Sequence, residues 1–356
     1  MSFELRKLED VCDILDHMRI PITSRDRKAG PYPYYGANGI QDYIDDYIFD
    51  DELVLLAEDG GNFGSKEKPI AYRISGKTWV NNHAHVLKPK NIIDVDYLCY
   101  SLMYYDVSGL VNGATRQKLT QSEMRKINIR YRSLEKQRQI VFEIKLVSNI
   151  ISSRKHQLCN LDLLVKSRFI EMFGDPITNT KRWPADKVEA VCSNIYGGGT
   201  PSKSKEEYWN GDIPWISSKD MKSDMISDSQ IRITNLGLDN SSAKLVPMNS
   251  VIMVIRSGIL KHTLPVAINT VPVTVNQDLK VFIPSASIHY RFLAFLFKML
   301  EKDILAGVRA VTADNIEFDT LKNRKIILPP VQLQNQFASF VTQVDKSKFV
   351  VTAKFQ

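Results

Sequence analysis

The sequence has little cysteine and no long apolar run. Four cysteines are present: Cys12, Cys99, Cys159 and Cys192. None forms a C-x-x-C pair, which argues against a zinc site and against a disulfide framework. The most apolar stretch, Phe292 to Leu300, is short and contains Lys298, so no segment is expected to span a bilayer. Because the first residues, MSFELRKLEDV, lack the apolar core of a secretory signal, we expect a cytoplasmic protein with reduced thiols.

Motifs of several enzyme classes are also missing. The only Pro-Pro step follows Leu328, so the Asn-Pro-Pro or Asp-Pro-Pro tetrapeptide of adenine methyltransferases is absent. There is no G-x-G-x-x-G cofactor loop and no nuclease carboxylate-lysine cluster. The segment SGKT, Ser75 to Thr78, ends like a phosphate loop, but Ala71 replaces the required glycine, so we expect a hairpin turn. We therefore predict no catalytic residues.

Two histidines have the spacing of metal ligands. His83 and His85 form an H-x-H pair, and on a strand both would project from one face. No cysteine or acidic pair completes a site in the sequence, so we expect no metal.

Length and charge permit a nucleic-acid partner without requiring one. The 356 residues suit two domains, and 44% of them are hydrophobic, enough for buried cores. The 47 lysines and arginines exceed the 40 acidic residues, giving a formal net charge of +7. A basic chain of this kind fits a polyanion partner.

The chain contains a tandem repeat whose parts recur in order. Leu5 to Ile14 is echoed by Trp183 to Ile195, each with a Val-Cys step. VNNHAHVLKP, Val80 to Pro89, is echoed by VNQDLKVFIP, Val275 to Pro284. Apolar helices, glycine turns and strand-to-helix segments containing Q-x-Q follow in both halves. The offset grows near Gly197 to Met221, which we read as an inserted loop rich in glycine, proline and serine.

A long helix is expected between the two copies. Leu134 to Phe173 contains no proline or glycine, and Gly174 and Pro176 supply stop signals. Its apolar stripe is predicted to pair with the helix that opens at Val331. The stripe that we expect at this partner interface comprises Ile140, Ile144, Val147, Ile151, Leu158, Leu161 and Val165.

Taken together, these segments resemble the specificity subunits of type I restriction-modification systems. The resemblance covers essentially the whole chain. It is carried by Tyr32 to Asp45, GNFGS at Gly61 to Ser65, Val80 to Pro89, Gln137 with Gln139, MFGDP at Met172 to Pro176, Gly198 to Ile216 and Leu328 to Gln336.

The resemblance implies an α+β fold with two globular mixed α/β target-recognition domains, separated by long helices that form an antiparallel coiled coil. The expected domains are 1–133 and 176–330 for recognition, 134–175 for the first spacer helix and 331–356 for a shorter second one. The implied partners are double-stranded DNA, methyltransferase subunits and a restriction/translocase subunit, with no membrane. The chain itself would bind no cofactor, since S-adenosylmethionine, ATP and Mg belong to the partners. The short second helix leaves the stripe around Ile140 to Ile151 unpaired, where it could drive self-association or weaken methyltransferase docking.

Residues that meet DNA should be polar and lie on loops, because base edges are read by donors and acceptors while lysine and arginine hold phosphates. Each could equally be an ordinary solvated side chain. In the first domain the candidates are Arg25, Arg27, Lys28, Asn62, Lys66, Lys68, Arg116, Gln117 and Lys118. In the second they are Thr200, Ser202, Lys203, Ser217, Ser218, Lys219, Arg256, Ser257, Lys261 and Arg309.

Two further expectations concern residues near these loops. Gly198 and Gly199 would let the backbone approach phosphate closely. Trp209 and Trp215, like Tyr32, Tyr34 and Tyr35, are expected to pack in cores or turns rather than to stack on bases.

Three alternatives compete with this function. A stand-alone DNA-binding or scaffold protein, or a truncated regulatory form of the subunit, would show the same charge and coiled coil. An unrecognised methyltransferase would bind S-adenosylmethionine by itself.

Overall fold

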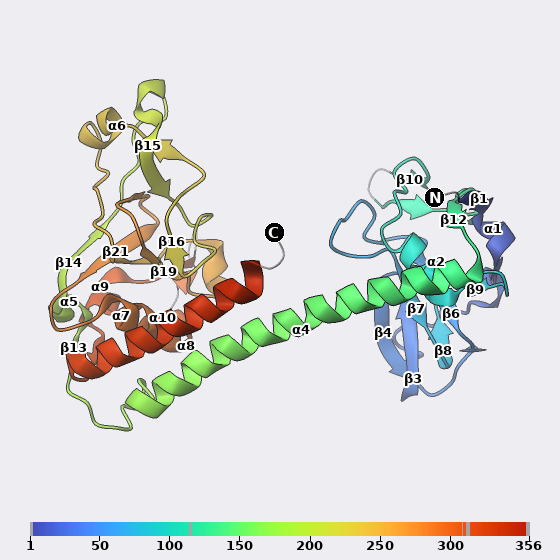
Figure 1. Cartoon of the computed structure of the whole chain (residues 1–356), viewed down its shortest axis with the longest axis horizontal. Coiled ribbons are helices and arrows are strands. Elements are labelled where there is room, and N and C mark those ends of the chain that lie inside the picture. Colours follow the sequence, from blue (N-terminus) through green and yellow to red (C-terminus); the bar gives the residue numbers. More distant parts are fainter. Residues whose placement is uncertain (1–2, 114–115, 308, 311–313, 354–356) are drawn as a thin grey trace. The chain divides into compact units, whose positions relative to one another are not determined.

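The chain folds into two compact units. The computed structural model describes all residues except 1–2, 114–115, 308, 311–313 and 354–356. The units are Met1–Ser153 and Arg154–Gln356, and the boundary falls inside helix α4 (Leu134–Phe173) (Figure 1). Among the described helices, none combines the length and apolar character that crossing a membrane requires.

Unit 1 is built on two four-stranded sheets, ordered β2-β9-β6-β7 and β4-β3-β8-β5, with the pairs β1-β12 and β10-β11. Its strands are β1 (Glu4–Lys7), β2 (Cys12–Ile14), β3 (Ala29–Gly36), β4 (Gly39–Ile44), β5 (Phe49–Asp50), β6 (Leu53–Ala57), β7 (Ala71–Ile74), β8 (Lys77–Val80), β9 (Ala84–Pro89), β10 (Val111–Asn112), β11 (Lys118–Leu119) and β12 (Asn128–Tyr131). Its short helices are α1 (Leu8–Val11), η1 (Asp16–Met18), α2 (Val95–Leu102) and α3 (Gln121–Met124).

Strand β6 lies at the centre of unit 1 because its sequence, LVLLA, is apolar on both faces. Successive side chains of a strand point to opposite sides. Accordingly, Val54 and Leu56 belong to the cluster that includes helix α2, whereas Leu53 and Leu55 belong to a second cluster with Val86. All of β6 is buried.

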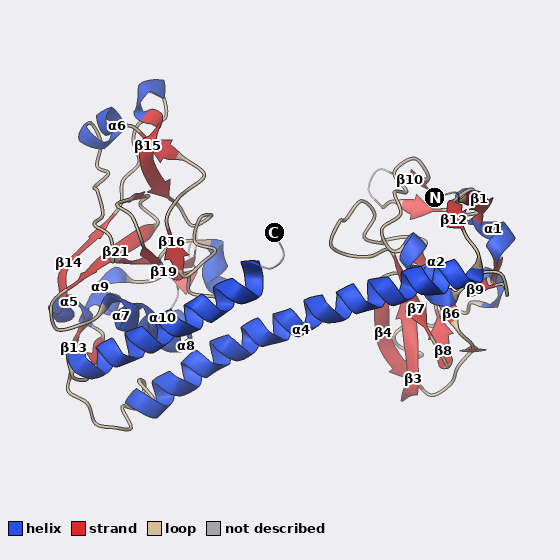
Figure 2. Cartoon of the chain, in the orientation of Figure 1, coloured by secondary structure: helices blue, strands red, loops and turns tan. Residues whose placement is uncertain are grey.

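Unit 2 contains a five-stranded sheet, β14-β21-β18-β19-β16, a three-stranded sheet, β17-β15-β20, and the pairs β13-β24 and β22-β23 (Figure 2). Its strands are β13 (Ala185–Lys187), β14 (Cys192–Gly197), β15 (Trp209–Ile216), β16 (Met225–Ile226), β17 (Arg232–Ile233), β18 (Val251–Val254), β19 (Val266–Asn269), β20 (Thr274–Val275), β21 (Leu279–Pro284), β22 (Arg309–Ala310), β23 (Asp314–Asn315) and β24 (Lys325–Ile327). Its helices are α5 (Val188–Val191), η2 (Glu206–Tyr208), α6 (Asn235–Asp239), η3 (Gly258–Lys261), α7 (Tyr290–Met299), α8 (Glu301–Leu305), α9 (Phe318–Asn323) and α10 (Val331–Ala353).

The two units share one strand plan, which confirms the tandem repeat. In unit 1, β9 pairs antiparallel with β2 and β6, and in unit 2, β21 pairs antiparallel with β14 and β18. A parallel pair also recurs, β3 with β8 and β15 with β20. The expectation that Gly197 to Met221 forms an inserted loop is wrong in part. The eight-residue strand β15, whose last residues are buried, lies within that segment.

The repeat extends to single hydrogen bonds at the start of the two long helices. The side-chain oxygen of Gln137 accepts from the amide of Asp94, the N-cap of α2, at 2.8 Å, and Gln334 accepts from His289, the N-cap of α7, at 2.8 Å. Both glutamines are fully buried. Each therefore fastens its long helix to the helix of its own unit.

Helices α4 and α10 pack antiparallel within unit 2, so the expected fold class is confirmed. The two helices run side by side in opposite directions (Figure 1). The rings of Phe169 and Phe337 lie 5.5 Å apart, and Lys348 binds Asp162 at 2.6 Å further along the pair. Val165 and Leu161 belong to the same core as Val344.

Other members of the predicted stripe lie outside the contact between α4 and α10. Ile140 and Ile144 are half-buried and line a cavity of about 520 Å³ beside α2, while Leu158 is half-buried on α4. Val147 and Ile151 are exposed, together with Phe142, so this segment of α4 carries bare apolar surface.

The turn at Ser75 to Thr78 is not a hairpin. Strands β7 and β8 flank it but belong to different sheets, so the chain turns a corner there. Gly76 supports the corner with φ of 70°, a conformation that favours glycine.

Candidate nucleic-acid interface

The glycine turn of unit 1 is fixed to the sheet by backbone pairing and charge. Leu119 donates its amide to the carbonyl of Glu58 at 2.7 Å, and Asp59 and Lys118 form an isolated β-bridge. Lys118 binds the Glu58 carboxylate at 3.0 Å, and Arg116 binds Asp59 at 2.8 Å. Two of the predicted DNA-binding residues are thus held by acidic neighbours.

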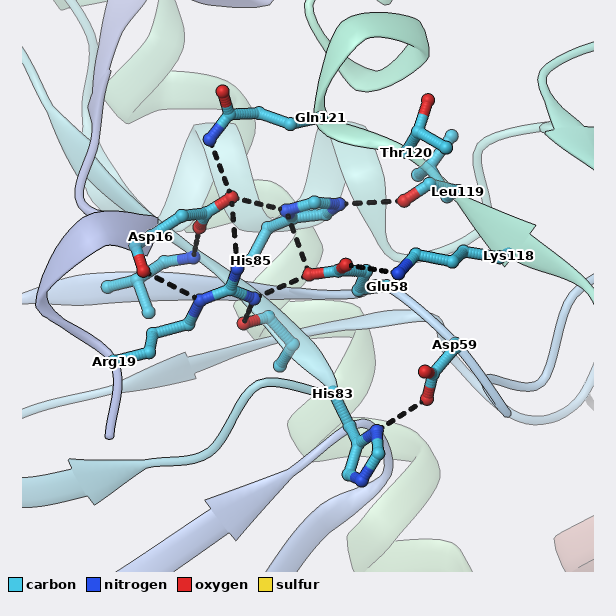
Figure 3. Close-up of polar contacts among 12 residues, drawn as sticks. Asp16, Arg19, Glu58, Asp59, His83, His85, Lys118, Leu119, Thr120 and Gln121 are labelled. Atoms are coloured by element: carbon cyan, nitrogen blue, oxygen red, sulfur yellow. Dashed lines mark hydrogen bonds and ion pairs between the residues drawn. The ribbon is translucent and has the colours of Figure 1, made fainter. Parts of the chain in front are cut away.

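Behind this turn lies a buried ion-pair network (Figure 3). His85 contacts Asp16 through Nδ1 at 2.6 Å and the carbonyl oxygen of Leu119 through Nε2 at 2.8 Å. Arg19 binds Glu58 at 2.6 Å and lies 3.6 Å from Asp16. The network therefore joins η1 and the ends of β6 and β9 to the turn that carries Lys118.

The surroundings of both carboxylates favour the charged form. Burial alone would raise the pKa of Asp16, but His85, through a hydrogen bond and its charge, and hydrogen bonds from Gln121 and Val86 outweigh it, so the pKa lies below its ordinary value. Burial opposes ionisation of Glu58 in the same way. Its pKa is nevertheless lowered by hydrogen bonds from Arg19 and Lys118 and by nearby positive charge.

The same cluster has the composition of a metal site, since ligand atoms of Asp16, Glu58 and His85 all lie within 4.8 Å of one another. Arg19 and Lys118 bind these carboxylates, however, and their positive charges oppose a cation there. The arrangement therefore has the character of an ion-pair network.

The two histidines of the H-x-H pair do not act together, contrary to the expectation that they share a strand face. His83 precedes β9 and binds Asp59 at 2.6 Å, whereas His85 lies within β9 and binds Asp16 (Figure 3). The strand begins only at Ala84, so strand geometry does not apply to His83.

In unit 2 several candidates meet at the turn formed by residues 276–278. Thr200 donates its hydroxyl to Gln277, and Arg256 binds Asp278 through Nε at 2.7 Å and Nη2 at 2.6 Å. The amide of Asn276 donates to the carbonyl of Ile216, directly before the Ser217 loop, at 2.9 Å. Three loops that are distant in sequence thus converge on one turn.

The Ser217 loop is ordered by its own acidic residue. Both the amide and the hydroxyl of Ser217 donate to Asp220, at 2.9 and 2.7 Å. Ser218 is half-buried, and Lys219 is exposed at the tip.

The glycines before Thr200 approach the protein itself rather than an open surface. A Cβ on Gly198 would lie 1.9 Å from the carbonyl oxygen of Val275, and one on Gly199 would lie 2.3 Å from Ser242. Internal packing therefore explains both glycines. Trp215 is buried as expected and donates to the carbonyl of Gly199 at 2.9 Å.

The aromatic residues that we expect to pack internally are buried to different degrees. Tyr34 is fully buried, whereas Tyr32, Tyr35 and Trp209 are half-buried. The ring of Trp209 contacts that of Trp215 at 5.5 Å.

The remaining candidates of unit 1 lie on two loops. Arg25 and Lys28 are exposed before β3, while Arg27 is half-buried, with its guanidinium 4.2 Å from the ring of Tyr34. Lys66 and Lys68 are exposed on the loop after β6, which also carries half-buried Asn62, and Gln117 is exposed in the glycine turn.

The remaining candidates of unit 2 occupy three loops. Ser202 and Lys203 are exposed before η2. The hydroxyl of Ser257 accepts from the amide of Ile259 and so caps η3, in which Lys261 is exposed. Arg309 begins β22, and its side chain lies outside the described residues.

The sequence did not single out the acidic partners in these clusters as part of an interface. Asp59 and Asp278 hold the two exposed arginines, and Asn276 and Gln277 form the turn on which unit 2 converges. The echo between Val80 to Pro89 and Val275 to Pro284 contained these turns. Their partners became visible only with the strand register.

A family model described as a type I restriction modification DNA specificity domain matches residues 2–160 and again residues 186–354. The chain belongs to this family. Its two matched segments correspond to the two copies that share one strand plan.

Curated relatives of this specificity-domain protein are named as specificity subunits of type I restriction enzymes. It is 39% identical over 188 residues to the type I restriction enzyme EcoR124I/EcoR124II specificity subunit of Escherichia coli, covering 52% of this chain and 46% of that one. The chain thus spans about half the length of that relative. It is 25% identical over 355 residues to a protein of Haemophilus influenzae named as a type I restriction enzyme specificity subunit, covering 96% of this chain and 87% of that one.

Solved structures show the same fold. The S subunit of a type I restriction-modification system from M. genitalium aligns over 99% of this chain and 92% of its own, with a TM-score of 0.62 and 12% identity. A chain from a type I R-M system structure gives 0.56 and 16% identity, covering 99% of this chain and 93% of that one.

Proposed function

We propose that this protein is the DNA-reading specificity subunit of a type I restriction-modification complex. Each unit reads one half of a bipartite target in double-stranded DNA. The observation that carries the proposal is the twofold match of the specificity-domain family to a chain whose two units share one strand plan. A duplicated reader suits a target with two half-sites.

In this proposal the chemistry belongs to the partners. Methyltransferase subunits bind S-adenosylmethionine and methylate adenines, and a restriction/translocase subunit uses ATP and Mg. The specificity subunit contributes DNA contacts and the helical frame, and it acts in the cytoplasm, where the DNA is. The exposed apolar segment of α4 around Val147 and Ile151 offers a docking surface for a methyltransferase subunit.

The decisive experiment is single-molecule mapping of methylated adenines in host DNA with and without this gene. The proposal predicts that deletion abolishes one bipartite, gapped motif and leaves other motifs unchanged. An unchanged methylation map, together with failure to co-purify with a methyltransferase subunit, would refute the proposal.

A stand-alone DNA-binding or scaffold role is the alternative. It predicts DNA binding without co-purification and without any change in methylation. A truncated regulatory form of the subunit predicts co-purification with an unchanged map. An isothermal titration with S-adenosylmethionine tests the methyltransferase alternative, which requires binding by the isolated chain.

A further inference from the structure

Both units contain the same three-way junction, at which a turn between two strands meets the end of the central strand and the glycine turn. In unit 1, the amide of Glu58 donates to the carbonyl of His83 at 2.9 Å, and Leu119 donates to Glu58 at 2.7 Å. In unit 2, Ile255 donates to Asp278 at 2.9 Å, and Ile316 donates to Ile255 at 2.8 Å. The backbone of the junction is thus repeated bond for bond.

Each junction presents one arginine held by one aspartate. In unit 1, Arg116 binds Oδ1 of Asp59 at 2.8 Å, and His83 contacts the same oxygen at 2.6 Å. In unit 2, Arg256 binds Oδ1 of Asp278, whose Oδ2 accepts from the side-chain amide of Asn276 at 3.2 Å. Each aspartate therefore contacts two side chains: the arginine that it holds, and a second neighbour that fixes the orientation of its carboxylate.

In both pairs the arginine is the more exposed partner. The side chain of Arg116 is 62% exposed and that of Asp59 is 17% exposed. The corresponding values are 49% for Arg256 and 27% for Asp278. Each aspartate thus supports its arginine from the protein side, while the guanidinium remains accessible.

The two pairs are placed differently on the shared backbone, because Arg256 occupies the position of Asp59 whereas Asp278 occupies that of His83 and not that of Arg116. In unit 1 the arginine comes from the glycine turn and the aspartate from the end of β6. In unit 2 the arginine follows β18 and the aspartate lies in the turn before β21. The same chemical group therefore recurs at one place in the fold without recurring in the sequence, which is hard to explain by duplication alone.

The chemistry of the guanidinium identifies what such a group would bind. Arg256 uses its Nε and Nη2 atoms on Asp278, so the edge formed by the two terminal nitrogens is available for a ligand. Two parallel donors match the O6 and N7 acceptors of guanine in the major groove. An arginine whose direction is set by a carboxylate also loses less side-chain entropy on binding.

We propose that Arg116 and Arg256 each read a guanine, one in each half of the target, and that Asp59 and Asp278 are positioning residues for them. This inference rests on the proposed function. It selects two residues that contact bases from the longer set of polar residues predicted to contact DNA.

The test uses the assembled complex with its methyltransferase subunits. Methylation rates are measured on duplexes that carry the wild-type motif or a single base-pair change at each position of it. Arg116→Gln should reduce discrimination at one G·C pair of one half-site by about 5- to 100-fold, and Arg256→Gln should do so only in the other half-site. Arg116→Lys should behave like Arg116→Gln, because lysine keeps the charge but loses the paired donors.

Asp59→Asn should weaken discrimination at the same base pair as Arg116→Gln, by a smaller factor, and leave the rest of that half-site unchanged. Matched controls are Arg73→Gln in unit 1 and Arg232→Gln in unit 2, since both arginines are also paired with carboxylates at the surface. Both controls should retain the full motif.

Three results would overturn the inference. One is unchanged discrimination in Arg116→Gln or Arg256→Gln, and another is a wild-type motif in Arg116→Lys. The third is a uniform loss of rate across all duplexes, which would mark a phosphate contact instead. If the wild-type complex methylates no bipartite motif, the proposed function itself fails, so the two failures are distinguishable.

Discussion

Gln137 and Gln334 make equivalent hydrogen bonds in the two units. Besides accepting from a helix N-cap, each donates through Nε2 to two backbone carbonyls, those of Ile92 and Arg132 in unit 1 and those of Ser287 and Pro329 in unit 2. A buried side-chain amide thus satisfies three backbone groups where each long helix leaves its unit.

Replacing either glutamine should destabilise its own unit. Gln137→Leu leaves buried backbone groups without partners, so we expect a loss of about 2–4 kcal/mol in the free energy of unfolding of unit 1. Hydrogen exchange resolved by residue should show faster opening in unit 1 only, and Gln334→Leu should show it in unit 2 only. Gln139 lies on the exposed face of the same helix, so the control Gln139→Leu should change the free energy of unfolding little. Equal effects from Gln137→Leu and Gln139→Leu would contradict the prediction.

The buried network predicts a strong asymmetry between two neighbouring aspartates. Asp16→Ala removes the buried carboxylate that contacts His85 and accepts from the amide of Val86, and it should destabilise unit 1 by about 3–5 kcal/mol. Asp13→Ala, on the exposed face of β2, should cost less than about 0.5 kcal/mol. Chemical denaturation followed by hydrogen exchange measures both. A small effect of Asp16→Ala would mean that the network contributes little to the fold.

The same carboxylates predict how stability depends on pH. The pKa values of Asp16 and Glu58 are lowered in the folded state, so their contribution is fully present above the unfolded values near pH 4. It is lost as the pH falls through the lower folded values. Unit 1 should therefore lose stability on the acid side of about pH 4, and Asp16→Asn should flatten this part of the profile. The profile is measured as the unfolding midpoint in denaturant at each pH, and identical slopes for the variant and the wild type would be inconsistent with it.

The exposed segment of α4 should matter for assembly and not for folding. Val147→Glu with Ile151→Glu places charge on bare apolar positions, so the melting temperature should hold while co-purification with the methyltransferase subunit falls at least tenfold. Ser152→Glu, at an exposed polar position of the same helix, is the control. Full recovery of the complex with the double variant would exclude this surface as the docking site.

Binding of the isolated chain to duplex DNA should weaken steeply with salt. Each lysine that holds a phosphate adds about 0.9 to the slope of log affinity against log salt. Lys66→Gln with Lys68→Gln should lower that slope by about two, and Lys126→Gln, which breaks an exposed pair with Glu123, should not. Fluorescence anisotropy across salt concentrations gives the slope. An affinity indifferent to salt would contradict phosphate contacts altogether.

Much of the architecture could be predicted because it depends on local patterns. Helix α4 follows from forty residues without proline or glycine, ended by Gly174, and the duplication follows from echoed strands. The stripe positions Leu161 and Val165 belong to the core shared with α10. Periodicity could not show that β15 lies inside the segment expected to be a loop. Its first six residues, WNGDIP, are typical of turns, and its burial depends on pairing with the distant strand β20.

The candidate interface was harder to predict because it depends on contacts between distant segments. Arg116 and Arg256 were among many polar loop residues, and nothing local distinguishes them. Only the bridge between Asp59 and Lys118, and the register of β18 with β21, bring Asp59 and Asp278 to the arginines. The packing reason for Gly198 could not be predicted for a similar reason, since the carbonyl of Val275 that it faces lies far away in the sequence.

The different placement of the two arginine–aspartate pairs has an evolutionary consequence. After a gene segment is duplicated, both copies initially select the same bases. At this junction, an arginine at the end of the central strand, in place of one on the glycine turn, changes the direction from which the guanidinium approaches a ligand, while the backbone bonds of Glu58 and Ile255 stay as they are. If each arginine reads a base as we propose, a duplicated unit can change its target through substitutions of these few side chains, without any remodelling of the strands that support them.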